Sequence, residues 1–304
     1  MYYCSIWPNN NTHSNSTQQL SDDLFHLNEW CETWKLKLNS RKCAHMRFSL
    51  SSKCNKLCDP VVYSVGNSAI VSVNNQKDLG ISVTSDLSWS SHYSKICKNA
   101  YFSLHLIKRI LPVTSSVRLK KQLYITIVRS HFSFCPQLWK PLYAKDFLNL
   151  ERVQRRATKY LLNDFVSDYK TRLHQLHLLP LSLWLDLQDI MFLIKCLKGQ
   201  GEDNNFNIFD YIQFSSGHTR SSGVKLMIKY CRTTTYRHFY LNRIVLIYNV
   251  IHSIINLSDP IYTIRCKVIS FLWSFFDSNF DPSNTCTYHL VCPCNSCHSS
   301  GLYV

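Results

Sequence analysis

The sequence predicts an α+β protein in which a small mixed segment precedes a mainly helical body and a tail rich in cysteine and histidine. Three observations support this fold class. Apolar residues recur every three or four positions from Leu20 to Trp34, as on the buried stripe of a helix. Polar and apolar residues then alternate from His45 to Leu50, as in a half-buried strand. Beyond residue 90 the spacing of apolar residues is mostly helical.

The mixed segment should contain a helix, two short strands and a hairpin. Ser16 and Gln19 have the spacing of a capping box, which marks the start of a helix. Two β-branched runs flank Gly66, as in a hairpin. The expected elements are a helix from Ser16 to Lys35, a strand at 44–50, a hairpin within 61–73 and a strand at 79–83.

The helical body is divided by prolines and by one polar stretch. Pro112 ends one helix and Pro180 opens another, because proline cannot sit in a helix interior but is tolerated in the first turn. In the second helix we expect the apolar side chains of Val117, Leu123, Ile127 and Val128 to face inward. Helices are expected from Ser90 or Ser91 to Leu111, from Thr114 onward, at 146–162, at 180–198, near 238–255 and near 264–277.

Positive charge dominates the composition. The chain of 304 residues has 34 Lys and Arg against 19 Asp and Glu, which gives a net charge of +15 at pH 7. This excess favours a polyanionic partner, nucleic acid or an anionic membrane surface. The apolar runs are too short to span a bilayer. Most of the 14 cysteines are scattered singly, and the N-terminus lacks the regions of a signal peptide. We therefore expect an intracellular protein, in the cytoplasm or nucleus, rather than a secreted one.

The stretch "LERVQRRATKYLL" (150–162) is the strongest candidate for a binding surface. Its apolar face consists of Leu150, Val153, Ala157 and Leu161. Four cations at i, i+3, i+4 and i+7 form a basic stripe on the other face: Arg152, Arg155, Arg156 and Lys159. A charge run is often only a solvated face, but the basic composition favours a surface that follows the phosphates of RNA or DNA. Nearby cations that can extend this surface are Lys108, Arg109, Arg118, Lys120 and Lys121.

The tail "CTYHLVCPCNSCH" (286–298) has the residue types of a zinc site. Thiolates and imidazoles suit tetrahedral Zn²⁺, and four ligands close a structural site. The alternative is a set of loose thiols. A zinc knuckle would help to grip nucleic acid rather than catalyse. The preferred ligands are Cys286, His289, Cys294 and Cys297, with Cys292 and His298 as alternatives.

Three blocks carry a resemblance to a known family: "LNEWCETWKLKLNSRKCAHMRFS", "KDLGISVTSDLSWSSHYSKICKNAYFSLHLIKRIL" and "LERVQRRATKYLLND". With the tail, they resemble the C-terminal half of the reverse transcriptases of non-LTR retrotransposons (LINE elements of the Jockey-like and chicken-repeat-like groups). Coverage runs from about residue 5 to the end. The family's polymerase is a right hand of fingers, palm and thumb, in which palm carboxylates hold two Mg²⁺ ions in the intact parent enzyme.

The resemblance begins just after the catalytic turn of that family, so we expect a truncated RNA-directed DNA polymerase that is inactive alone. Asp22 and Asp23 do not replace the catalytic aspartates, because they fall within a predicted helix rather than at a hairpin turn. Lys42 matches a palm lysine that can act as a general acid toward pyrophosphate, or it is simply solvated. Lys77 and Gly80 match the hairpin that supports the primer terminus, or they belong to an ordinary edge hairpin.

The resemblance also divides the chain. The expected parts are a disordered N-terminus (1–15), a palm remnant with the palm–thumb hairpin (16–89), a helical thumb-like domain (90–198), a linker (199–223), a helical C-terminal region (224–280) and a Cys/His tail (281–304).

Two functions follow as hypotheses. The first is a reverse-transcriptase fragment that retains surfaces for template and primer, with RNA and DNA as partners, no membrane and no small-molecule substrate. The alternative is a non-catalytic intracellular nucleic-acid-binding protein with a C-terminal zinc knuckle. A relic with no selected role would bind neither RNA nor DNA.

Overall fold

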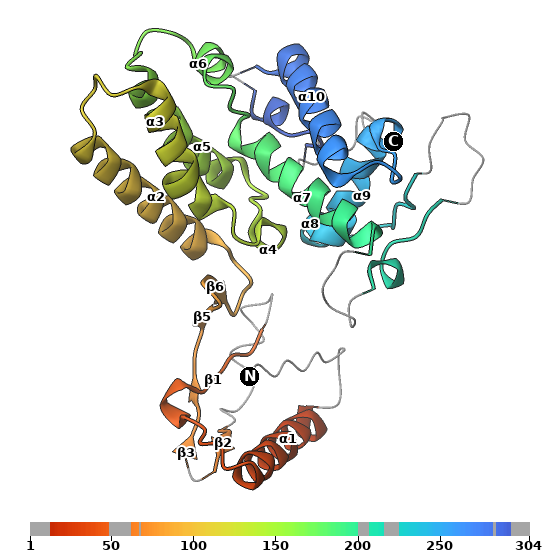
Figure 1. Cartoon of the computed structure of the whole chain (residues 1–304). Helices are drawn as coiled ribbons and strands as arrows, with labels where there is room; N and C mark the ends of the chain where they lie inside the picture. Colours follow the sequence, from red (N-terminus) through yellow and green to blue (C-terminus); the bar gives the residue numbers. More distant parts are fainter. Residues whose placement is uncertain are drawn as a thin grey trace. The chain divides into compact units, whose positions relative to one another are not determined.

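The computed structural model of the chain describes residues 13–48, 62–66, 68–199, 207–215, 225–281 and 284–292. Both helices and short strands are present, which confirms the mixed α+β composition that the sequence predicts. The chain forms two compact units, Met1–His92 and Tyr93–Val304, and each is described by itself. Figure 1 shows the helices and strands of both.

The first unit holds one long helix and three two-stranded sheets. β1 pairs with β4 in parallel, whereas β2 with β3 and β5 with β6 pair antiparallel. A small core forms where Tyr63, Val65 and Ile70 pack against Leu20 and Leu24 of the helix. The elements are α1 (His13–Thr33), β1 (Ala44–His45), β2 (Ser64–Val65), β3 (Ser68–Ala69), β4 (Val71–Ser72), β5 (Asn75–Asp78) and β6 (Ile81–Thr84).

The hairpin around Gly66 is confirmed, but the ends of the other three elements differ from the prediction; the strand predicted at 79–83 is Ile81–Thr84. Gly66 lies in the turn between β2 and β3 with φ +56°, a conformation that glycine adopts without strain. The helix begins at His13, so Ser16 lies inside α1 and does not cap it. Trp34 follows the end of α1 and is exposed rather than buried. Only Ala44–His45 of the predicted strand 44–50 forms a strand, and Ser49 and Leu50 lie outside the described residues.

The second unit is helical and is organised around α7 (Leu181–Leu197). This helix contacts α4, α5, α9 and α10, and most of its side chains are buried, although the stripe of Trp184, Gln188 and Phe192 is not. Figure 1 shows α7 (green) between α5 and α10. The other helices are α2 (Ser90–Ile110, which begins in the first unit), α3 (Val117–Leu123), α4 (Pro136–Trp139), α5 (Ala144–Leu162), α6 (Tyr169–Gln175), α8 (Thr234–His238), α9 (Tyr240–Ile251) and α10 (Ile261–Asn279).

Proline and small polar residues set the helix ends. Pro180 stands at the start of α7 and Pro112 follows the end of α2, as the sequence predicts. Thr114 does not start α3, because the cap is Ser116, whose hydroxyl accepts a hydrogen bond from the Leu119 backbone N–H at 3.3 Å. The short helices α4 and α6 do not follow from the sequence pattern.

The inward face of the α3 region also differs from the prediction. Val128 is buried as predicted, but Val117 and Ile127 are exposed, and Lys120 and Tyr124 are buried instead. The helix continues after Leu123 as a π-helical segment, Tyr124–Val128, which rotates the side chains relative to an α-helix. The burial of Lys120 matters for the candidate site below.

The described part of the predicted linker 199–223 is ordered by contacts. Ile208 and Ile212 are buried, and Phe214 forms an antiparallel β-bridge with Leu226. The division of the helical unit at this segment stays a prediction. Among the described residues, no helix combines the length and the apolar character that a bilayer crossing requires.

Candidate nucleic-acid interface

The α5 helix has one buried apolar face and one cationic face. Leu150, Val153, Ala157 and Leu161 are all fully buried, which confirms the predicted inner face. The helix ends at Asn163, which adopts the left-handed conformation (φ +53°) and donates its backbone N–H to the last turn. Because the inner face is fixed by packing, the opposite face must point outward.

The four stripe cations line one open hollow together with a lysine of the neighbouring helix. Arg152 and Arg156 are exposed, and Arg155 and Lys159 are half-buried. The hollow has a volume of about 480 Å³ and also includes two aromatic rings. We call it the basic hollow; its lining residues are Lys108, Arg152, Arg155, Arg156, Lys159, Tyr160 and Phe165.

Carboxylates do not neutralise the basic hollow. Among the described residues, none of its five cations forms an ion pair with Asp or Glu. Arg152 hydrogen-bonds the neutral Asn149 side chain at 2.8 Å. Burial and the neighbouring Arg156 cation lower the pKa of Lys108, which shows that the cations repel one another. An anion placed in the hollow would relieve that repulsion.

Glu151, the one acidic residue within the basic segment, points into the protein. It is fully buried, accepts a hydrogen bond from the Tyr169 hydroxyl and accepts another from the Leu181 backbone N–H at 3.0 Å. Burial raises the pKa of Glu151 to about 7, although these hydrogen bonds oppose the shift. Glu151 therefore ties α5 to α6 and α7, and its carboxylate lies in the interior, where the nearby Arg155 cation also acts to lower its pKa.

Aromatic rings hold several of the cations in place. The Arg155 guanidinium lies 4.8 Å from the centre of the Tyr169 ring and donates a hydrogen bond to the Tyr288 hydroxyl. Arg156 lies 5.8 Å from the Tyr101 ring, and Lys108 lies 5.2 Å from the Tyr160 ring. Cation–π contacts of this kind position a charge without neutralising it. The hollow is thus preorganised and still cationic.

The other predicted cations of this unit do not line the basic hollow. Arg109 and Arg118 are exposed on α2 and α3, and Lys121 is half-buried. Lys120 is buried: its Nζ donates to the Val113 carbonyl at 3.0 Å and lies 5.3 Å from the Tyr160 ring. Lys120 is therefore not part of the candidate surface, because its ammonium is hydrogen-bonded in the interior.

The predicted residues of the first unit lie on separate elements. Lys42 is exposed on a 3₁₀ turn just before β1, and Lys77 is exposed on β5. Gly80 lies in the turn of the β5–β6 hairpin with φ +94°, a conformation that favours glycine. Asp22 lies on α1 and accepts a hydrogen bond from Gln18 one turn earlier, at 2.9 Å. This is the helical setting that the sequence predicts for the aspartate pair.

Half of the predicted zinc ligands can be located. Cys294, Cys297 and His298 lie outside the described residues. The imidazole of His289 is buried 4.9 Å from the Phe147 ring, and burial together with the Lys140 cation lowers its pKa to about 3. Cys292 is also buried, and Cys286 is half-buried. Within the ranges that the structure describes, no three His, Cys, Asp or Glu side chains are grouped so as to hold a metal. The zinc site stays a prediction.

A second charged cluster, which the sequence did not predict, lies inside the helical unit. Lys140 donates to Asp186 and, at 3.2 Å, to Asp189. Arg243 donates its Nε to Asp189 at 3.2 Å and also bonds the carbonyls of Gln137 and His238 at 2.9 Å. We call these residues (Lys140, Asp186, Asp189 and Arg243) the buried charge cluster. All four are buried, and its two cations face two carboxylates.

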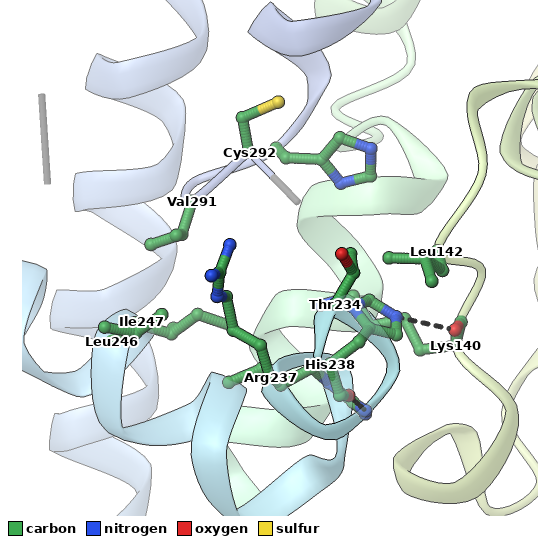
Figure 2. Close-up of a pocket in the computed structure, with 11 residues that line it drawn as sticks. Lys140, Leu142, Thr234, Arg237, His238, Leu246, Ile247, Val291 and Cys292 are labelled. Atoms are coloured by element: carbon green, nitrogen blue, oxygen red, sulfur yellow. Dashed lines mark hydrogen bonds between the residues drawn. The ribbon is translucent and has the colours of Figure 1, made fainter. Parts of the chain in front are cut away.

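A small pocket borders the buried charge cluster. Figure 2 shows Arg237 and His238 of α8 and Val291 and Cys292 of the tail around it. His238 Nε2 lies 3.0 Å from the Lys140 carbonyl, and burial with the Arg243 cation lowers the pKa of His238 to about 3. The pocket has about 30 Å³, the space of a water molecule or two, which is too small for a nucleotide. The cluster joins α4, α7 and α9.

Comparisons with family models, with curated proteins and with solved structures found no match to this chain.

Proposed function

We propose that the chain binds the sugar–phosphate backbone of RNA or DNA through the basic hollow, inside the cell. The observation that carries the proposal is the grouping of five cations from α2 and α5 without a neutralising carboxylate. A folded protein tolerates such a group at its surface, but the mutual repulsion is relieved by phosphates. Arginine also matches the planar, two-oxygen edge of a phosphate better than lysine does.

The length of the stripe suits a short run of phosphates. Arg152 and Lys159 are seven residues apart on α5, which corresponds to about 10 Å along a helix axis. Phosphates on one strand of a duplex are spaced about 3.4 Å apart along its axis. The stripe can therefore contact roughly three successive phosphates, and Lys108 on α2 widens the contact across the hollow. Contacts of this kind position a strand and carry no base sequence information.

The wider proposal is that this surface belongs to a portion of a non-LTR reverse transcriptase that binds template or primer and does not polymerise alone. Its support is the order of the sequence blocks, together with the helical setting of Asp22 and Asp23 on α1. A primer-extension assay with Mg²⁺ tests it. We expect no incorporation of deoxynucleotides, and incorporation by the pure protein would end this part of the proposal.

The second candidate is a non-catalytic nucleic-acid-binding protein whose C-terminal tail forms a zinc knuckle that also contacts the nucleic acid. It is favoured by the hydrogen bond between Tyr288 of the tail and Arg155 of the stripe, which docks the tail beside the basic hollow. We expect protein purified without chelator to contain one Zn²⁺ per chain and to lose affinity for RNA when the metal is removed. Metal-free protein with full affinity would exclude a zinc contribution.

Charge reversal tests the binding proposal itself. Arg152→Glu combined with Arg156→Glu should weaken binding of any RNA or DNA sequence, because phosphate contacts are lost and new anions repel the strand. Fluorescence anisotropy with a labelled 20-nucleotide RNA and a 20-base-pair DNA measures this. The matched control is Lys195→Glu with Arg232→Glu, two exposed cations that do not line the hollow. Equal affinities of the two variants would contradict the proposal.

A further inference from the structure

The turn that follows α5 has a fixed shape. Asn163 ends the helix in the left-handed conformation, and its N–H bonds back to the last turn. The Asp164 carboxylate then accepts hydrogen bonds from the backbone N–H groups of Val166 and Ser167, each at 3.0 Å. The Ser167 carbonyl in turn accepts a hydrogen bond from the buried Arg172. Side chains on this turn are therefore presented in a defined direction.

Phe165 sits on this turn at the edge of the basic hollow. Its side chain is 67% exposed, and it lines the hollow together with the five cations. Among the described residues its ring stacks on no other aromatic ring. An exposed phenylalanine does not contribute to the core. Its face is available to another flat, apolar group.

Val166, the next residue, provides an internal comparison. Its side chain is 97% exposed, but it does not line the hollow. A protein partner that covered this turn through apolar contact would bury both side chains. A planar ligand held by the cations would meet Phe165 and not Val166.

We propose that the basic hollow selects single-stranded nucleic acid, with its cations on successive phosphates and one unpaired base stacked on Phe165. This inference rests on the proposed function and adds the class of strand. In a duplex the bases are paired and stacked inside, so the ring has no base face to meet. An unpaired base can swing onto an aromatic side chain, and stacking of this kind does not depend on the identity of the base.

The geometry also assigns different tasks to the two parts of the hollow. The cations hold any phosphate backbone, and their contribution falls with salt. The stack of a base on Phe165 involves little charge, so its contribution persists at higher salt. Single-strand binding therefore has a salt-resistant part that duplex binding lacks.

The test measures the affinity of a 12-nucleotide RNA and of the corresponding duplex for three variants. Phe165→Ala should weaken single-strand binding by about 5-fold to 150-fold, the range for loss of one base stack, and should leave duplex binding unchanged. Phe165→Tyr keeps an aromatic face and should retain wild-type affinity. Val166→Ala should change neither affinity, and circular dichroism checks that each variant is folded.

The outcomes separate this inference from the proposed function. If Phe165→Ala leaves single-strand binding unchanged while the Arg152/Arg156 charge reversal weakens it, the inference is wrong and backbone binding stands. Equal losses from Phe165→Ala on single strand and duplex would also overturn it, as would an equal loss from Val166→Ala. If the wild-type protein binds neither probe, the proposed function fails first.

Discussion

The helical unit contains two groups of cations that differ in almost every physical respect. In the buried charge cluster, Lys140 and Arg243 are buried and face Asp186 and Asp189. In the basic hollow, five cations lie at the surface and no carboxylate pairs with them among the described residues. The first group is neutral as a whole and the second is strongly positive. A buried charge must be paired inside the protein. An exposed charge is solvated by water and can bind a ligand of opposite charge.

The two groups differ in what they contribute: the buried charge cluster stabilises the fold, and the basic hollow can bind a ligand. The cations of the buried charge cluster donate hydrogen bonds to carboxylates and to backbone carbonyls, so their charge is balanced inside the protein. The basic hollow uses the rings of Tyr101, Tyr160 and Tyr169, which hold cations without cancelling their charge. Removing charge should therefore destabilise the fold in the first group and weaken binding in the second.

The largest expected effect is on stability, from Asp189→Asn. The variant keeps the shape of the side chain but leaves Lys140 and Arg243 buried with one carboxylate between them. We expect the free energy of unfolding to fall by about 3–5 kcal/mol. Urea denaturation measures this, with Asp259→Asn as control, since Asp259 pairs with the exposed Lys267 and its loss should cost only about 0–1 kcal/mol. Equal effects of the two substitutions would break the comparison.

The second prediction concerns pH. The pKa values of His238 and His289 are lowered to about 3, so the folded protein binds fewer protons than the unfolded chain between about pH 3 and 6.5. Stability should therefore fall as the pH drops through this window, by about 1.4 kcal/mol per pH unit for each histidine. His238→Gln should remove one such contribution. His105→Gln, at an exposed position of α2, serves as control.

Glu151 has the opposite effect on the pH dependence of stability over part of this range. Its pKa is raised to about 7, so the folded state holds a proton that the unfolded chain releases above about pH 4.5. Its contribution to stability is present at acidic pH and is lost as the pH rises toward 7. Glu151→Gln should therefore make the acid loss of stability steeper than in the wild-type protein. An unchanged slope would show that Glu151 is ionised in the fold.

A smaller effect is expected where Arg155 of the basic hollow contacts Tyr288 of the tail. Tyr288→Phe removes the hydrogen bond to Arg155 but keeps the buried ring. We expect a loss of about 0.5–1.5 kcal/mol in the free energy of unfolding. Tyr236→Phe, at a half-exposed ring, should change little. A zero effect of Tyr288→Phe would mean that Arg155 is held by its contacts with the Tyr169 and Tyr288 rings and not by the hydrogen bond.

The smallest effect on stability should come from the hollow itself. Arg156→Gln removes a surface charge that pairs with no Asp or Glu among the described residues, so stability should change by at most about 0.5 kcal/mol. Because the substitution relieves repulsion, the change should be a gain and should be larger at low salt. Thermal unfolding in 20 mM and 300 mM NaCl measures it. A loss above about 1 kcal/mol would indicate that Arg156 is structural.

The features that can be predicted from the sequence are those that depend on neighbouring residues. The two faces of α5 follow from a 3.6-residue period, and the turn at Gly66 follows from local turn chemistry. Burial of Lys120 was not reached, because it depends on the Val113 carbonyl and on the Tyr160 ring of another helix. In the sequence, Lys120 and Lys121 look like two ordinary solvent-exposed lysines.

The buried charge cluster left a signal that was overlooked. Asp186 and Asp189 are three residues apart in a helix that is otherwise apolar on nearly all sides, and acids in such a helix must have cationic partners. Those partners, Lys140 and Arg243, are 46 and 54 residues away along the chain, so only the tertiary structure identifies them. Phe165 was overlooked for a similar reason, since nothing local distinguishes an exposed aromatic ring from a core one.

The most direct test of the central claim is the salt dependence of binding to a single-stranded RNA. Arg152→Gln with Arg156→Gln should reduce the slope of log K against log salt by about 1.4, because each lost phosphate contact on a single strand contributes about 0.7. The control variant Lys195→Gln with Arg232→Gln, which removes the same charge outside the hollow, should retain the wild-type slope. Identical slopes for wild type and both variants would show that the basic hollow does not hold phosphates.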